Sequence, residues 1–158
     1  MKADISPMQY MRAHGQKAGP TQRPFLTGAL SGLAGSIPMV AIRFYSGALA
    51  SEANALHLSV ATAAVLTVAV AVLFGVVYAF VFQRAANDAR GGWMFGSGFG
   101  FLVWMLGPVG LWLLFGGQPL ATGRGAMGLF AGYVVYGLTL GAVFPFINKG
   151  LQKRFRSL

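Results

Sequence analysis

The sequence predicts an all-α integral membrane protein, a bundle of four transmembrane helices, and three observations carry this prediction. Hydrophobic residues make up 56% of the 158-residue chain and charged residues only 9%, against about 25% in soluble domains. Only 3 residues are acidic, too few to cover a soluble domain with interspersed charges of both signs. Four apolar runs are long enough for spanning helices, which need roughly 20 residues. This composition excludes a soluble enzyme, a DNA-binding module and a disordered chain.

The elements follow in order along the chain. Residues 1–24 form a basic N-terminal tail, in which Ser6-Pro7 favours the start of a short surface helix; a flexible tail is the alternative. Residues 25–147 form the transmembrane domain, and residues 148–158 a basic C-terminal tail. The four apolar runs are Phe25–Ile42, closed by Arg43, Ala55–Phe82, closed by Gln83, Trp93–Phe115, and Ala126–Ile147.

Two of these runs need comment. The second is longer than a span requires, so we expect its polar beginning, at Asn54, His57 and Ser59, to project from the membrane. The first run and Ala48-Leu49-Ala50 together resemble a secretory signal with its cleavage site. Because the run is as long as a full span and Arg43 separates it from that site, we expect a retained helix.

Basic residues predict the orientation in the membrane. Ten of the 12 Lys and Arg residues lie in the two tails and in the loop after the second run, and only Arg43 and Arg124 lie on the other side. The positive-inside rule then places both termini in the cytoplasm. The net charge of +9 predicts anionic lipids at the cytoplasmic face as partners, and no nucleic acid.

The sequence contains a candidate tandem repeat of two-helix hairpins. A shift of 70 residues aligns three residues of the first run and its loop with the third run and its loop, and a shift of 66 aligns the second run with the fourth. The aligned residues are Gly28, Pro38 and Gly47 with Gly98, Pro108 and Gly117, and Val68, Gly75, Val77 and Phe80 with Val134, Gly141, Val143 and Phe146.

Glycines at helical spacing predict close helix contacts. Lipid is as apolar as the helix surfaces, so helix association in a membrane depends on close packing, which glycine permits. One interpretation is packing within a single bundle. The other is that at least one face binds another subunit, since four short helices need few such faces. The glycines are Gly28 and Gly32 in the first run, Gly96, Gly100 and Gly107 in the third, and Gly128, Gly132, Gly137 and Gly141 in the fourth. Pro38 and Pro108 predict helix kinks.

A polar cluster is predicted on the outer side. Glu52 is its only acidic residue, and we expect an exposed ion pair with Arg43 or Arg124 that contributes little to stability. His57 is either an interfacial histidine or a ligand of haem or a chlorophyll-type pigment, although the only other histidine, His14, lies in the opposite tail. The full set is Arg43, Glu52, Asn54, His57, Gln118 and Arg124.

The pattern of the four runs resembles a group of small bacterial four-span inner-membrane proteins of unknown function. The resemblance covers residues 25–147 and implies the fold and the membrane, with no activity. In that group a histidine opens the fourth-helix motif, where this chain has Tyr133. The matching features are the glycine-rich first run, His57 opening the second, Gly75–Tyr78 near its end, and Val135-Tyr136-Gly137 followed by Gly141.

Three functions remain open, and none is enzymatic, because the runs hold no paired carboxylates, metal-binding motif or phosphate loop. The first is a structural or accessory subunit of a larger membrane assembly or a homo-oligomer. The second is a small channel or carrier for an uncharged or lipid-like solute; an ion-coupled transporter is disfavoured, because no Asp, Glu or Lys lies centrally in any run. The third is a haem- or pigment-binding protein; otherwise no cofactor and no metal are expected.

Overall fold

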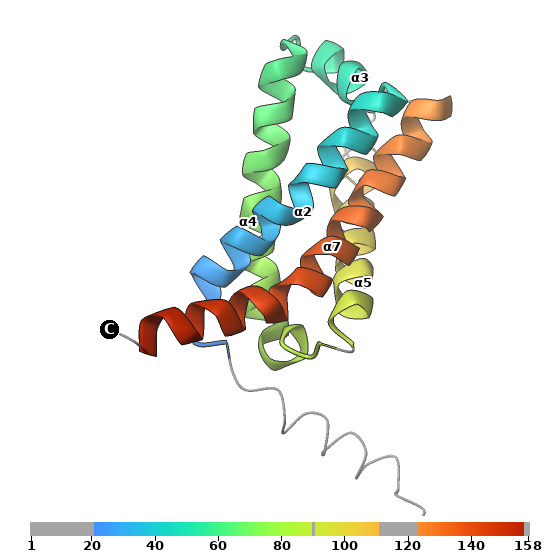
Figure 1. The fold of residues 1–158 in the computed structure, drawn as a ribbon. Helices are drawn as coiled ribbons and strands as arrows, with labels where there is room; N and C mark the ends of the chain where they lie inside the picture. The colour runs from blue at the N-terminus through green and yellow to red at the C-terminus, as the bar shows by residue number, and fades with distance from the viewer. Residues whose placement is uncertain (1–20, 90, 111–122, 157–158) are drawn as a thin grey trace, which may run out of the picture.

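The computed structural model describes residues 21–89, 91–110 and 123–156, and the predicted all-α fold is confirmed in them (Figure 1). Four helical segments are long and apolar enough to cross a membrane. The elements are α2 (Pro24–Ser46), α3 (Ala48–Ala55), α4 (Val60–Ala86), α5 (Gly92–Trp104) with its π-helical continuation η1 (Met105–Val109), and α7 (Gly123–Arg156).

Helix α2 runs one turn beyond its predicted end. Pro24 occupies its first turn, where the missing N–H costs nothing. The helix continues past Arg43 because its C-cap is Gly47, which adopts a left-handed φ of 81° and donates its N–H to the Phe44 carbonyl at 3.2 Å. Arg43 therefore lies inside the last turn of α2, where a cation is favoured by the helix dipole.

The segment between α2 and α4 contains the short helix α3, which lies between the first two predicted runs. Its Leu49 and Ala53 are buried against Ala63 of α4 and Val40 of α2. The next helix starts only at Val60, because the Ser59 side chain caps it by accepting the Thr62 N–H at 3.1 Å. The second apolar run is therefore not one continuous helix: Ala55 ends α3, and residues 56–59 connect α3 to α4.

Prolines and one distorted residue shape the other helices. Gln83 has φ 33° and breaks the regular part of α4, at the residue where the sequence ends the second run. Pro108 lies in the π-helical segment η1. Pro38 lies inside α2, which is α-helical on both sides of it. The predicted kinks do not include Pro145, near which α7 bends (Figure 1). Beyond it α7 remains helical to Arg156, through most of the predicted tail.

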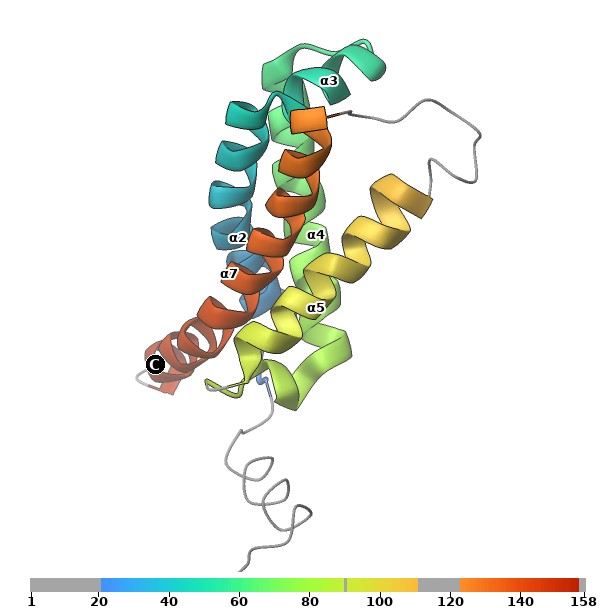
Figure 2. The ribbon, with the colours of Figure 1, turned by 90° about the vertical axis from the view of Figure 1, so that its right-hand side faces the viewer.

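The spans form an asymmetric bundle. Helix α2 packs against α4 on one side and α7 on the other, and α7 also packs against α5. Helices α4 and α5 meet near one end only, and α5 leans away from α4 toward the other (Figure 2). We call the end with α3 the outer end and the end with the C-terminus the cytoplasmic end, after the predicted orientation.

The interior near the cytoplasmic half is filled by aromatic side chains. The Tyr78 ring lies 4.9 Å from Phe82, 5.3 Å from Phe99 and 5.6 Å from Phe144, measured between centroids. Tyr78, Phe144 and Tyr136 are almost completely buried. Their hydroxyls are used between helices: Tyr78 donates to the Gly92 carbonyl at 3.3 Å, and Tyr136 to the Ala71 carbonyl at 2.6 Å.

Candidate functional site

A buried ion pair joins α2 to α3 at the outer end. The guanidinium Nη2 of Arg43 donates to the carboxylate Oε2 of Glu52. Gly47 turns the chain between the two helices, so that α3 folds back over the last turn of α2 and brings Glu52 to Arg43. Arg43 is 3% exposed and Glu52 8%. The prediction of an exposed, weak pair is therefore wrong: the partners are those expected, but the environment is not.

Helix α7 supplies the third wall of this site. The Arg43 guanidinium carbon lies 5.5 Å from the centroid of the Tyr133 ring, in cation–π geometry. A Cβ atom on Gly132 would come within 2.9 Å of the Arg43 Cγ, and one on Gly128 would overlap the Ser46 side chain. The first glycine pair of α7 is thus a groove for the aliphatic stem of Arg43 and for Ser46. We call Arg43, Glu52 and Tyr133 the outer ion-pair cluster.

The chemistry of the outer ion-pair cluster is electrostatic. A lone charge buried in a bundle is costly, and a paired one is tolerated only with good geometry. Arg43 and Glu52 neutralise each other, and the Arg43 Nε finds no acceptor among the described residues. The described residues contain no group of three or more side chains that could hold a metal ion. The arrangement links α2, α3 and α7.

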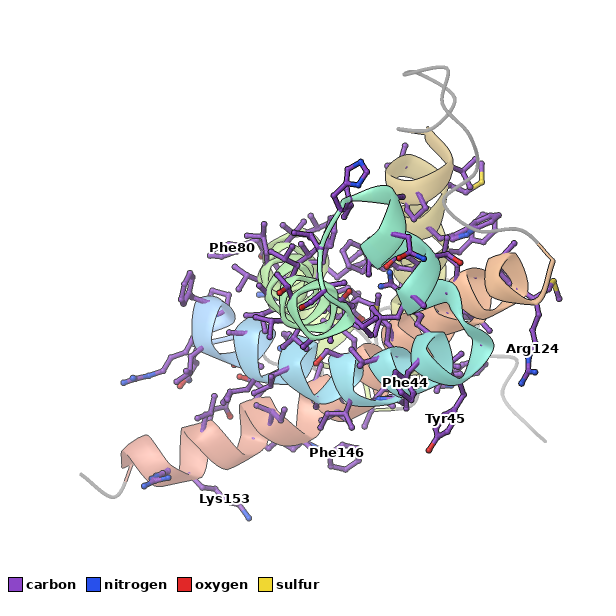
Figure 3. The ribbon with its side chains drawn as sticks, turned by 90° about the horizontal axis from the view of Figure 1, so that it is seen from above. Phe44, Tyr45, Phe80, Arg124, Phe146 and Lys153 are labelled. Atoms are coloured by element: carbon purple, nitrogen blue, oxygen red, sulfur yellow. The ribbon has the colours of Figure 1, made fainter. Side chains whose placement is uncertain are left out.

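The other predicted outer polar residues do not join this cluster. Asn54 and His57 are exposed, at the end of α3 and in the turn after it. His57 has a left-handed φ of 54°, which a turn tolerates more readily than a helix. Arg124 is exposed and points away from the bundle at the start of α7 (Figure 3). Gln118 and His14 lie outside the described residues.

The remaining predicted glycines form two seams with the same design. In the first, a Cβ on Gly32 of α2 would lie 2.6 Å from the Ala71 carbonyl of α4, and Gly28 faces Gly75 similarly. In the second, Gly96 and Gly100 of α5 face Gly137 and Gly141 of α7. A Cβ on Gly96 would lie 2.7 Å from the Gly141 Cα. Both seams hold helix backbones in direct contact, as small residues permit in membranes.

These seams correct two sequence interpretations. Gly96, and not Gly98, is the structural equivalent of Gly28, because a Cβ on Gly98 would meet nothing within 4 Å; the first alignment of the repeat is therefore off by two residues. The chain also lacks the expected excess of glycine faces, since both glycine faces of α7 contact other helices of the same chain. Among the glycines predicted to make close helix contacts, only Gly107 meets no described atom within 4 Å.

A polar network closes the cytoplasmic end. Asn148 of α7 donates to the Asn87 Oδ1 at 2.8 Å, and the Asn87 amide donates to the Thr21 Oγ1 at 2.8 Å and the Gln83 carbonyl at 3.4 Å. Thr21 also donates to the Gln83 carbonyl at 3.1 Å. The distortion at Gln83 exposes this carbonyl to side-chain donors, so α2, α4 and α7 are linked here.

One seam of the bundle stays open. Along α5, Phe95 and Phe99 contact aromatic residues of α4, and Leu102 and Leu106 continue the same face at helical spacing. Because α5 leans away (Figure 2), Leu102 is 50% and Leu106 74% exposed. On α4, Phe74 contacts Phe99 of α5, and Val70, one turn farther toward the outer end, is 44% exposed. We call Val70, Leu102 and Leu106 the open seam.

Comparison of the chain with protein-family models, with curated proteins and with solved structures gives no match.

Proposed function

We propose that this protein is a non-enzymatic structural or accessory subunit of a membrane assembly, either a homo-oligomer or a complex with other membrane subunits. It would reside in a bacterial inner membrane with both termini in the cytoplasm. The observation that carries the proposal is the open seam between α4 and α5. The candidate repeat makes this seam the counterpart of the closed contact between α2 and α7, and the described residues leave it uncovered.

The packing of the interior supports a role exerted through the surface. Large buried side chains, among them Tyr78, Tyr136 and Phe144, occupy the space between the spans. A channel or carrier needs a polar or open path through that space, and the described ionisable pair, Arg43–Glu52, is neutralised at one end. A pigment or haem function has as its candidate ligand only the exposed His57. The subunit function needs neither a path nor a ligand.

Disulfide crosslinking tests the proposal, because the chain has no cysteine. Leu106→Cys places a thiol on the open seam, and Ile37→Cys is the matched control on α2. Both native residues are largely exposed, Leu106 at 74% and Ile37 at 70%. Mild oxidation in membranes is expected to link Leu106→Cys to a second copy, or, with a cysteine scan of a co-purifying subunit, to that subunit. Ile37→Cys is expected to stay unlinked.

Two results contradict the proposal. Equal crosslinking of both variants would indicate random collision in the membrane. A monomer that is purified gently, brings down no other subunit and forms no Leu106→Cys link would remove the subunit function and favour the channel or carrier.

A further inference from the structure

Helix α3 is a small cap on the outer end of the bundle. It has 8 residues and lies between the ends of α2 and α4 (Figure 1). Its one large buried apolar side chain is Leu49, and the others are alanines. Leu49 and Ala53 pack on Ala63 of α4 in a cluster that is separate from the main aromatic core. The ion pair of Glu52 with Arg43 is therefore a major part of what holds α3 in place.

The chain turns sharply at both ends of this cap. Gly47, before α3, has a φ of 81°, and His57, after it, has a φ of 54°. Neither conformation continues a helix, so α3 is connected to α2 and α4 through short non-helical joints. A small unit with its own apolar cluster opens at a lower free energy than the whole bundle. Movement of α3 therefore leaves the main core packed.

Arg43 has binding capacity that Glu52 does not use. A guanidinium carries five N–H donors in a planar fork that matches the two oxygens of a carboxylate. The Nη2 of Arg43 donates to one oxygen of Glu52, while Nε has no acceptor among the described residues. Arg43 is almost completely buried, and a buried donor without an acceptor is destabilising. A carboxylate that is not attached to α3 is free to bind through both of its oxygens.

The surroundings of Arg43 select the class of ligand. The site contains one positive charge, so a single negative charge neutralises it, whereas a dianion leaves a buried excess. The Tyr133 ring lies beside the guanidinium, with its centroid 5.5 Å from the guanidinium carbon. On α3, the neighbours of Glu52 on the buried side are Leu49 and Ala53. A small monocarboxylate with an apolar stem matches this charge and these walls.

We propose that Arg43 and Tyr133 form a carboxylate-binding site that Glu52 fills from within the chain, and that a short monocarboxylic acid displaces Glu52 and releases α3. This inference does not rest on the proposed subunit function. Because Glu52 belongs to the same chain, it competes at an effective concentration in the millimolar range or above. A free acid must exceed that concentration in the parent chain, and much less is needed when the Glu52 carboxylate is removed.

The first test removes that carboxylate. Glu52→Ala deletes the atoms of an acetate ion, and its thermal unfolding midpoint in detergent is followed as sodium acetate is added, with sodium chloride at matched ionic strength as reference. Acetate should restore most of the lost midpoint, and acetamide, which has the same shape without the charge, should restore none. Two control variants should not respond: Glu52→Gln, which keeps the space filled, and Arg43→Leu/Glu52→Ala, which lacks the cation.

The second test follows the release of α3 in chains that keep Glu52. Ala63→Cys lies beneath α3 and Met39→Cys lies in the main core, and the native residues are 4% and 3% exposed. Acetate on the order of 100 mM, above the millimolar effective concentration of a tethered group, should speed thiol labelling of Ala63→Cys several-fold. Met39→Cys should stay protected under the same conditions.

Several outcomes would overturn the inference. Equal rescue of Glu52→Ala by acetamide, or rescue that persists in Arg43→Leu/Glu52→Ala, would show that the charge of Arg43 is not involved. Equal rescue by sulfate would indicate a general effect of anions. Labelling of Ala63→Cys that does not respond to acetate would show that Glu52 is not displaced, and equal labelling of Met39→Cys would indicate unfolding of the whole bundle. If Glu52→Ala fails to fold, the labelling of Ala63→Cys decides alone.

Discussion

At the scale of single residues, the least expected feature is an arginine enclosed by three helices. Arg43 directly follows an apolar run, and a charged side chain at the end of a membrane span is expected to reach water. Its burial is possible because Gly132 makes room for the stem, Glu52 supplies the opposite charge and Tyr133 lies beside the guanidinium. Because each of these partners comes from another segment, the environment of Arg43 depends on tertiary structure.

The first prediction concerns this ion pair. Arg43→Leu leaves a buried carboxylate without a partner and should lower the free energy of unfolding by about 3–5 kcal/mol. Replacing both residues, in Arg43→Leu/Glu52→Leu, should restore most of that loss, because two apolar side chains carry no desolvation cost. Chemical or thermal unfolding in detergent measures both, with exposed Arg124→Gln as control. Two single variants whose losses simply add in the double variant would show that the pair does not interact.

The second prediction concerns His57. The side chain is exposed in a turn, so His57→Ala should change the stability little and leave the visible spectrum of the purified protein without bands. His57→Gly should be at least as stable, because glycine adopts the left-handed φ of 54° without strain. A Soret or chlorophyll band that is present in the parent chain and lost in His57→Ala would instead establish the cofactor function.

At the scale of helices, the glycine seams determine which spans touch. Helix α2 meets α4, and α5 meets α7, through glycines that bring backbone against backbone. The sequence identified these glycines as packing residues from their spacing alone. It could not say which helix each face meets, because spacing defines a stripe on one helix and not its partner. That ambiguity produced the supposed surplus of faces.

Helix α3 and the bend of α7 were missed for related reasons. The sequence of α3, ALASEANA, is only 8 residues long and carries polar residues, so it has no run long enough for a span. Pro145 lies near the end of the fourth run. A proline at that place is typical of a helix end as well as of a bend, so the sequence does not distinguish the two. The bond between Asn148 and Asn87 anchors the part of α7 beyond this proline to the residue that follows α4.

The third prediction tests the seams with neighbouring glycines of α5. A Cβ on Gly100 would overlap the Tyr133 carbonyl and lie 3.0 Å from the Gly137 Cα, whereas one on Gly98 would meet nothing within 4 Å. Gly100→Ala should lower the stability by about 1–3 kcal/mol through overpacking. Gly98→Ala should be neutral or gain up to about 1 kcal/mol in helix propensity. Equal melting temperatures of the two variants would rule out the α5–α7 seam as described.

At the scale of the whole molecule, the number and order of the spans follow from the sequence, while the asymmetry of the bundle does not. Composition and run length are enough to predict four membrane helices, because each run must satisfy its own backbone hydrogen bonds in lipid. The open seam depends on the lean of α5, which follows from packing between side chains far apart in the sequence. The candidate repeat alone would have predicted two equivalent seams.

The fourth prediction concerns the orientation. Lys149 and Arg84 are exposed at one end and Arg124 at the other. In intact cells, a membrane-impermeant thiol reagent should label Arg124→Cys and spare Lys149→Cys and Arg84→Cys until the cells are permeabilised. Labelling of Lys149→Cys from outside would show that the orientation is the reverse of the predicted one.

The length of α7 couples the two faces of the membrane. At 1.5 Å per residue, its 34 residues extend about 50 Å along the helix path, against roughly 30 Å for the hydrocarbon layer. One helix therefore carries the Gly132 groove near one face of the membrane and Lys149 near the other, with the bend near Pro145 between them. A change of sequence that alters the path of α7 at one face consequently has only this bend to keep it from displacing the residues at the other face.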